Sequence, residues 1–166
     1  LPTLIGTAAI FLVALATYVY NDVMDLEFDK LSHRERPLVS GVVSKRQALN
    51  MTVASAIGAI VLSVSLNLGA FFLALAGLVL AYAYSTPPFK FKDRFLLKHV
   101  ATALGMAISN FLGGVAVGGL RPTVLYGGGI FFILSMVLAA LADMGDMDSD
   151  LAAGRRTLPI LSLIHI

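Results

Sequence analysis

The stretch from residue 47 to residue 89 contains no Asp, Glu, Lys or Arg. A helix needs about 20 apolar residues to cross a hydrocarbon core of ~30 Å, so these 43 positions predict two crossings, with a turn near Asn67-Leu68-Gly69. Residues 1–20, 100–120 and 122–142 are also uncharged and predict one crossing each. Pro122 suits the first turn of the last helix, where its missing N–H costs nothing. We therefore expect an all-α fold, a polytopic transmembrane helical bundle with five spans.

The composition supports a membrane protein. Of the 166 residues, 58% are hydrophobic and 13% are charged, whereas soluble domains carry about 25% charged residues. This composition leads us to expect membrane lipid around the chain. The net charge of +2 is too small to indicate a nucleic-acid partner, and we expect none. The absence of cysteine excludes disulfides, thiolate metal sites and cysteine nucleophiles.

The charges are unevenly distributed over the predicted crossings. Eleven of the twelve Lys and Arg residues follow the first, third or fifth span, and therefore share one side; only Arg121 lies opposite. The positive-inside rule makes that side cytoplasmic, which predicts a multi-pass protein of the cell membrane with cytoplasmic active-site loops. All ten Asp and Glu residues lie there too. Because acidic residues hardly influence orientation, their placement indicates a function.

Two aspartate motifs share the same spacing. Asp22, Asp25 and Asp29 stand at positions i, i+3 and i+7, which we expect to put the three carboxylates on one face of a helix continuing from the first span. Asp143, Asp146 and Asp150 repeat these offsets 121 positions later. The repeat predicts two related halves whose acidic faces lie opposite each other at one end of the bundle.

This arrangement suits magnesium and a diphosphate. Mg²⁺ prefers oxygen ligands and is usually held by one or two carboxylates together with water and substrate phosphate. Metal ions between the two faces would clamp the diphosphate of a prenyl donor and neutralise the departing pyrophosphate. The apolar spans would shelter an isoprenoid tail. We predict a metal site formed by six residues: Asp22, Asp25, Asp29, Asp143, Asp146 and Asp150. Four of them are the predicted catalytic residues: Asp22, Asp25, Asp143 and Asp146.

Basic residues near the motifs have two interpretations. Arg34, Arg36, Lys90 and Lys92 would bind phosphate, or they would serve as topology signals and lipid headgroup contacts. The remaining basic residues of these loops are expected to be topological: Lys45, Arg46, Arg94 and Lys98.

Other polar residues near the motifs also leave alternatives open. Asn21 would order the first motif or cap a helix. Tyr84 would be an interfacial anchor or would point into the cavity near the cation. His33 and His99 have no partner pattern and are expected at the membrane interface.

Three segments together resemble the UbiA prenyltransferase superfamily. Asn21-Asp22-x-x-Asp25-x-x-x-Asp29, followed by Arg36-Pro37-Leu38 and Gly41, is similar to its first signature. Tyr84-Ser85, Pro87-Pro88 and the lysines Lys90 and Lys92 resemble the segment between its motifs. Asp143-x-x-Asp146-x-x-x-Asp150 with Gly154-x-x-Thr157-Leu158-Pro159 resembles its second signature.

The resemblance implies a nine-helix bundle around a central cavity, with a cytosolic cap that carries both motifs. It implies Mg²⁺-dependent transfer of a prenyl group from a prenyl diphosphate to a lipophilic acceptor through an allylic carbocation. Carried over by position, the metal–diphosphate complex would involve Asn21, Asp22, Asp25, Asp143 and Asp146, with Asp29 and Asp150 completing the faces. The second motif is closer to the digeranylgeranylglyceryl phosphate synthase and chlorophyll synthase branches than to haem O synthase.

The two chain ends predict a fragment. Leu1 already lies inside an apolar run, and residues 161–166 read like one translated frame of a common sequencing adaptor. We therefore expect a single transmembrane domain over residues 1–160, incomplete at both ends, and an artefact at 161–166.

Three other functions remain as alternatives. A cation transporter or channel would use the aspartate clusters as an ion path, but it predicts carboxylates near span centres. A soluble all-α terpene synthase conflicts with the long uncharged runs. A structural membrane subunit would tolerate loss of the aspartates.

Overall fold

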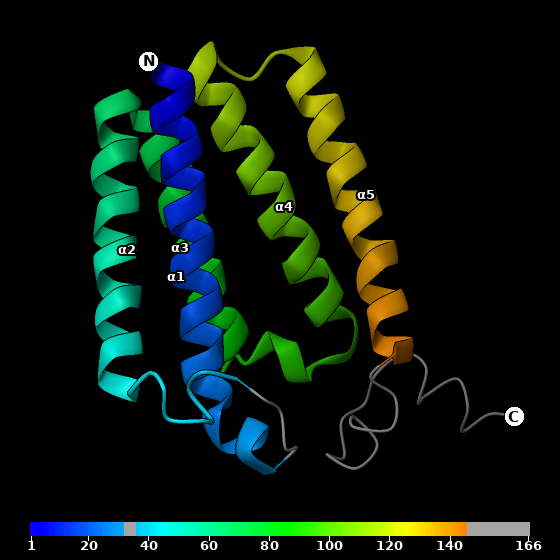
Figure 1. Cartoon of the computed structure of the whole chain (residues 1–166). Helices are drawn as coiled ribbons and strands as arrows, with labels where there is room; N and C mark the ends of the chain where they lie inside the picture. Colours follow the sequence, from blue (N-terminus) through cyan, green and yellow to red (C-terminus); the bar gives the residue numbers. More distant parts are fainter. Residues whose placement is uncertain (32–35, 146–166) are drawn as a thin grey trace, which may run out of the picture.

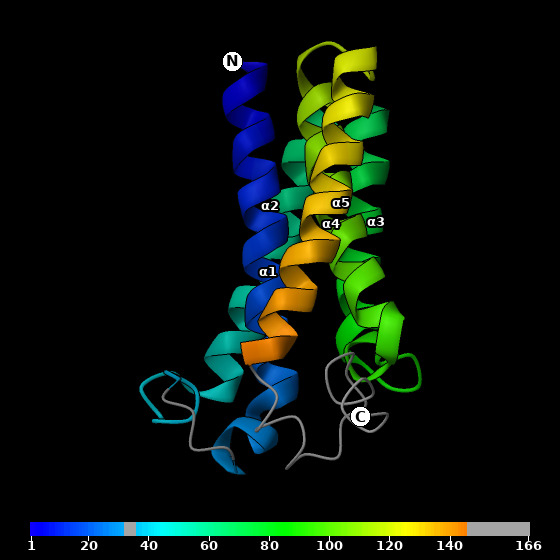
Figure 2. The same cartoon turned by 90° about the vertical axis from the view of Figure 1, so that its right-hand side faces the viewer.

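The computed structural model describes residues 1–31 and 36–145, which form five long α-helices and one short 3-10 helix. The long helices are α1 (Pro2–Leu31), α2 (Lys45–Leu66), α3 (Leu68–Ser85), α4 (Phe95–Val117) and α5 (Pro122–Gly145), and the 3-10 helix η1 (Phe91–Asp93) precedes α4. They run roughly side by side along one axis (Figures 1 and 2). All five are long and apolar enough to cross a membrane.

The predicted spans are confirmed, and local sequence signals explain their ends. Asn67 separates α2 from α3, and its Oδ1 accepts a hydrogen bond from the Ala70 N–H at 2.9 Å. α3 ends at Ser85, just before Pro87-Pro88, where a helix cannot continue. Pro122 is the first residue of α5, as expected.

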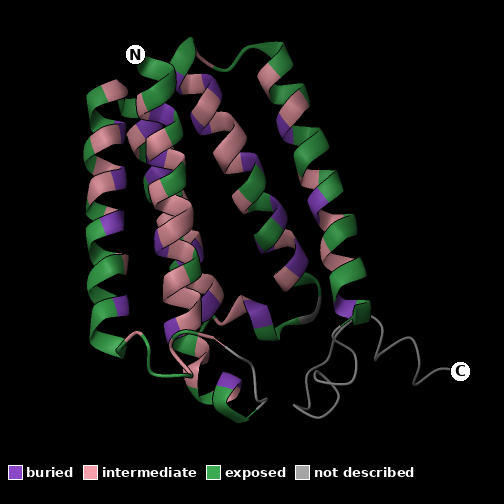
Figure 3. Ribbon diagram, viewed as in Figure 1, coloured by how far each residue is buried: buried purple, intermediate pink, exposed green. Residues whose placement is uncertain are grey.

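The helices pack through small residues. α1 lies against α2, α3 and α4, whereas α5 packs on α4 (Figure 1). The buried hydrophobic residues are mostly alanines, and Ala9, Ala74 and Leu112 form the central cluster. Small side chains let membrane helices approach closely. Many large apolar residues are exposed. Exposed positions recur along α2 and α5 (green in Figure 3), as suits contact with lipid.

The helix order brings the charged segments to one end of the bundle. The end of α1, the start of α2, η1 with the start of α4, and the end of α5 all lie at the bottom of Figure 1. The Asn67 turn and the Gly118–Arg121 connection lie at the other end. The predicted common side of the charged loops is therefore confirmed within the described residues. α1 continues through the first aspartate motif, since its 30 residues extend well beyond the first span.

Candidate functional site

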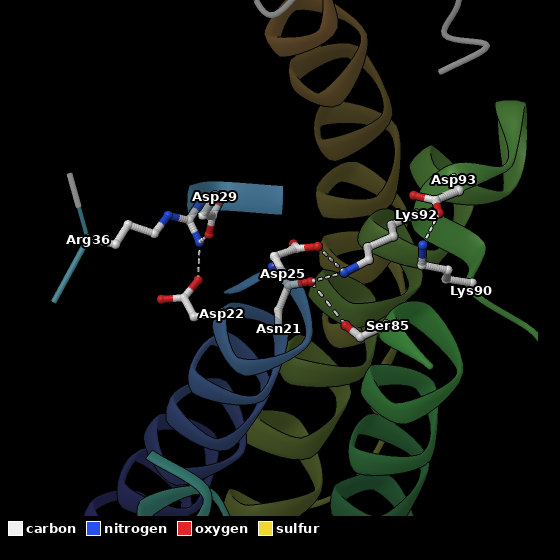
Figure 4. Close-up of polar contacts among 9 residues, drawn as sticks. All are labelled: Asn21, Asp22, Asp25, Asp29, Arg36, Ser85, Lys90, Lys92 and Asp93. Carbon is white, nitrogen blue, oxygen red and sulfur yellow. Dashed lines mark hydrogen bonds and ion pairs between the residues drawn. The ribbon is translucent and has the colours of Figure 1, made fainter. Parts of the chain in front are cut away.

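The first acidic group lies on the last turns of α1. Asp22 and Asp29 both contact Nη1 of Arg36, which belongs to the segment that leads back from α1 to α2 (Figure 4). The distance from this nitrogen to Oδ2 of Asp29 is 3.1 Å. Asp29 is buried, with 2% of its side chain exposed, whereas Asp22 is 36% exposed. A single guanidinium reaches both carboxylates, so they share a face, as their spacing predicts.

Asp25 belongs to a second group, which joins α1 to the segment between α3 and α4. Nζ of Lys92 donates to Oδ1 of Asp25 at 2.6 Å and lies 3.4 Å from Oδ1 of Asn21. Nδ2 of Asn21 donates to Oδ2 of Asp25 at 3.2 Å, and Oγ of Ser85 donates to Oδ1 of Asn21 at 3.0 Å. These contacts are drawn in Figure 4. Lys92 and Ser85 are buried. Asn21 lies inside α1 and orders the motif, so the capping alternative is wrong.

The three carboxylates of the first motif therefore do not converge on one point. At about 100° per residue, Asp25 is offset from Asp22 by about 60° around the helix, whereas Asp29 is offset by about 20°. This offset lets Asp25 face Lys92 while the other two face Arg36. Within the described residues, no three acidic or histidine side chains lie close enough together to hold a metal ion by themselves.

Asp143 forms a third group, between α5 and α4. Its Oδ1 accepts a hydrogen bond from Nζ of Lys98, and its Oδ2 lies 3.1 Å from Nε2 of His99, although the ring is not aligned for a hydrogen bond. Asp143 and His99 are each only 1% exposed. Two predictions are thus wrong. Lys98 contacts a motif carboxylate rather than serving only topology, and His99 is buried rather than interfacial.

The predicted opposition of the two acidic faces stays a prediction, and among the described contacts Asp143 pairs with α4 and not with the first motif. The reason is that α5 packs on α4, so the end of α5 meets the start of its neighbour. The other second-motif carboxylates, Asp146 and Asp150, lie outside the described residues, as do Arg34, His33 and residues 161–166.

The remaining predicted residues lie in the α3–α4 region. Nζ of Lys90 is 2.5 Å from Oδ2 of Asp93, within the same short loop, so the structure does not bring it to the acidic motifs. Tyr84 is partly buried in the last turn of α3. Its role stays a prediction.

A contact between α1 and the end of α3 was not predicted from the sequence. The hydroxyls of Tyr20 and Thr86 are 2.6 Å apart, and the Tyr20 ring stacks on that of Tyr82 at 6.2 Å between centroids. These contacts fix the end of α3 to α1 beside Asn21. Tyr20 sits in an apolar run like any core aromatic, and only the helix packing reveals its partner.

The donor set fits magnesium in its chemistry. The motif side chains offer hard oxygen atoms, which Mg²⁺ prefers. Oδ2 of Asp29 and Oδ2 of Asp143 are buried and have no hydrogen-bond partner among the described residues. Such carboxylate oxygens retain lone pairs for a further ligand. Because Mg²⁺ usually takes only one or two carboxylates and completes its shell with water and phosphate, three converging carboxylates are not required.

These features define a class of protein: an integral membrane protein of several helices, with paired carboxylates and cations gathered at one end of an apolar bundle. The sequence of residues 1–163 matches the family model of the UbiA prenyltransferase family, and the chain belongs to this family.

Named relatives agree with this assignment. Digeranylgeranylglyceryl phosphate synthase from Thermococcus kodakarensis is 32% identical over 92% of the chain and 53% of the relative. The synthase of the same name from Sulfurisphaera tokodaii is 30% identical over 95% of the chain and 56% of the relative. A UbiA homolog from Archaeoglobus fulgidus, solved with GPP and Mg²⁺, superposes with a TM-score of 0.83 at 21% identity, covering 96% of the chain and 57% of that protein. The chain spans about half the length of the curated relatives it matches.

Proposed function

We propose that the whole protein transfers a prenyl group from a prenyl diphosphate to a lipophilic acceptor and requires Mg²⁺. The observation that carries this proposal is the position of the acidic motifs, where carboxylates from α1 and α5 lie at one end of an apolar bundle in a member of this family. An isoprenoid diphosphate has the same division, with a charged head and an apolar tail. The site therefore offers each part of the substrate a matching environment.

The proposed roles follow the motifs. The catalytic carboxylates that hold the metal–diphosphate complex are Asp22, Asp25, Asp143 and Asp146, with Asp29 and Asp150 as further metal-binding positions. The residues proposed to bind the substrate are Asn21, Arg34, Arg36, Tyr84, Lys90 and Lys92. Arg36 and Lys92 lie directly against the first-motif carboxylates, which supports their proposed role as phosphate-binding cations beside the metal ligands of that motif.

The reaction balances as a substitution at carbon. The allylic C–O bond breaks and its electron pair leaves with pyrophosphate, the acceptor nucleophile bonds to the resulting carbocation, and the acceptor loses a proton. When bound, Mg²⁺ supplies charge neutralisation to the departing pyrophosphate. The side chains of Arg36 and Lys92 would orient the same group, and the apolar helices would exclude water from the cation.

The names of the relatives suggest an acceptor class. The Thermococcus and Sulfurisphaera relatives are called digeranylgeranylglyceryl phosphate synthase, which describes a glycerol phosphate with two geranylgeranyl chains. We infer that the acceptor here is a glycerol phosphate that already carries one prenyl chain, and that the donor is geranylgeranyl diphosphate. Chlorophyllide and aromatic acids are the alternatives to be compared.

We also propose that the charged end faces the cytoplasm. Within the described residues, the basic side chains of the α1–α2 and α3–α4 connections lie at this end, and Arg121 lies at the other. Lysine and arginine in short loops favour the cytoplasmic side. The prenyl diphosphate, proposed as a cytoplasmic metabolite, would then meet the site directly.

The test uses the full-length protein purified in detergent. Pyrophosphate release from geranylgeranyl diphosphate is measured with each acceptor, once with Mg²⁺ and once with EDTA. We expect release only with Mg²⁺ and a singly prenylated glycerol phosphate. If folded protein releases no pyrophosphate with any donor or acceptor, the proposed function is wrong. A cation transporter would instead move ions without consuming the donor; the end position of the described carboxylates does not favour it.

A further inference from the structure

Asp143 is held from both sides by two consecutive residues of α4. Lys98 contacts Oδ1, and Nε2 of His99 lies 3.1 Å from Oδ2. Neighbouring positions on a helix are about 100° apart, so their side chains diverge and can flank a single carboxylate. Since each oxygen faces a different partner, rotation of the carboxylate about its Cβ–Cγ bond would break both contacts.

Burial makes these contacts necessary. Asp143 is 1% exposed, and an isolated carboxylate at such a position would be strongly destabilised. The first turns of α4 provide the positive end of a helix dipole together with Lys98 and His99. The negative charge of Asp143 is therefore stabilised by α4.

The His99 ring makes no hydrogen bond within the described residues. Its side chain is 2% exposed, and Nδ1 has no hydrogen-bond partner among the described residues. Nε2 of the ring lies 3.1 Å from Oδ2 of Asp143. An apolar side chain would fill a buried position between helices without leaving polar nitrogen atoms unsatisfied. The contact with Asp143 is the polar interaction that accounts for a histidine here.

We propose that Lys98 and His99 are positioning residues that fix the orientation of Asp143 and thereby set the affinity of this carboxylate for the metal ion. This inference rests on the proposed function, since it takes Asp143 as a metal ligand. The two residues act through the carboxylate and do not themselves bind metal or substrate. Groups that hydrogen-bond to metal ligands typically contribute about 10- to 100-fold to metal affinity. Lys98 makes such a hydrogen bond to Asp143, and His99 lies against the other carboxylate oxygen.

The experiment measures metal binding directly in the full-length protein. Mn²⁺ is titrated in the presence of an unreactive thiolo analogue of geranylgeranyl diphosphate, and the free ion is followed by electron paramagnetic resonance. We expect His99→Leu and Lys98→Met to weaken Mn²⁺ binding about tenfold or more. His99→Gln and Lys98→Arg, which retain an N–H donor, should recover most of the affinity. Lys45→Met, which removes an exposed lysine at the same end of the bundle, is the matched control and should bind Mn²⁺ as the wild type does.

A second comparison separates positioning from a packing defect. In the Asp143→Asn background, His99→Leu and Lys98→Met should cause no further loss of Mn²⁺ affinity, because they act through the missing carboxylate. Additive losses in that background would overturn the proposal, as would wild-type affinity in both single variants. If the wild-type protein shows no Mg²⁺-dependent pyrophosphate release, or Asp143→Asn binds Mn²⁺ normally, the failure lies in the proposed function itself.

Discussion

Asp25 and Lys92 form a largely buried ion pair in the candidate site. Their side chains are 16% and 6% exposed, so the pair is largely removed from solvent. Removing one partner of such a pair leaves an uncompensated buried charge, which is strongly destabilising. The Lys30–Glu27 pair on the same helix end is 50% and 83% exposed, and pairs of this kind contribute little. The ion pair of the acidic motif therefore differs from the neighbouring surface pair in being buried.

Substitution of the motif aspartates tests their role. We expect Asp25→Ala and Asp146→Ala each to lower pyrophosphate release by about 100-fold or more, because each removes a charged oxygen ligand that acts on the departing group. The measurement is the initial rate at saturating Mg²⁺ and donor. Glu27→Gln is the control, since Glu27 is exposed and pairs only with Lys30 among the described contacts. Near-normal turnover in Asp25→Ala or Asp146→Ala would remove these residues from the metal site.

The sequence identifies the aspartates of the candidate site, but it does not predict all of the side chains that they contact. Arg36 lies seven positions after Asp29, and its proximity follows from the short return segment. Lys98 and His99, in contrast, meet Asp143 across about 45 positions of chain. That contact depends on how α4 and α5 pack, which a single sequence does not encode in any local pattern.

Among the elements, α4 and α5 approach each other closely at Gly114. A Cβ added at Gly114 of α4 would clash with both methyl groups of Val124 in α5, with 2.8 Å to Cγ2. Valine is β-branched and has little rotamer freedom within a helix. The pair therefore limits how near α5 can lie to α4 at the end of the bundle away from Asp143.

A glycine-to-alanine comparison within α4 tests this packing. Gly114→Ala should destabilise the protein by about 1–3 kcal/mol, because an extra methyl group is forced into a filled interface. Gly105→Ala is the matched control on the same helix, since a Cβ there meets nothing within 4 Å. It should be neutral, or stabilising by up to about 1 kcal/mol, through helix propensity. Thermal unfolding in detergent measures both. Equal midpoints for the two variants would contradict the close contact.

The helices themselves are largely predictable from the sequence. Long uncharged runs specify the crossings, Asn67 marks one turn, and Pro122 marks the start of α5. The helix ends on the charged side are less predictable. α4 begins at Phe95, five residues before its uncharged run, because the polar residues Lys98 and His99 find partners inside the bundle. Tertiary contacts thus allow α4 to begin before the uncharged run that predicts it.

For the whole molecule, the proposed orientation can be tested with single cysteines, because the chain contains none. Val42 follows α1 at the charged end and is 80% exposed, and Leu120 at the other end is 52% exposed. In sealed cells, we expect a membrane-impermeant maleimide to label Leu120→Cys from outside and to leave Val42→Cys unlabelled until the cells are opened, in a background free of other cysteines. The reverse pattern would place the charged end outside.

The length of α1 has a consequence for how the reaction would proceed. Its 30 residues span about 45 Å, against a hydrocarbon thickness of ~30 Å. Residues 2–20 form the uncharged part of this helix, so the first aspartate motif, which follows them, would lie at the level of the lipid headgroups. The proposed reaction would therefore release its two products into different phases, with pyrophosphate diffusing into the aqueous solution and the prenylated lipid remaining in the bilayer. Inhibition by pyrophosphate would follow its molar concentration, whereas inhibition by the lipid product would follow its mole fraction in the membrane.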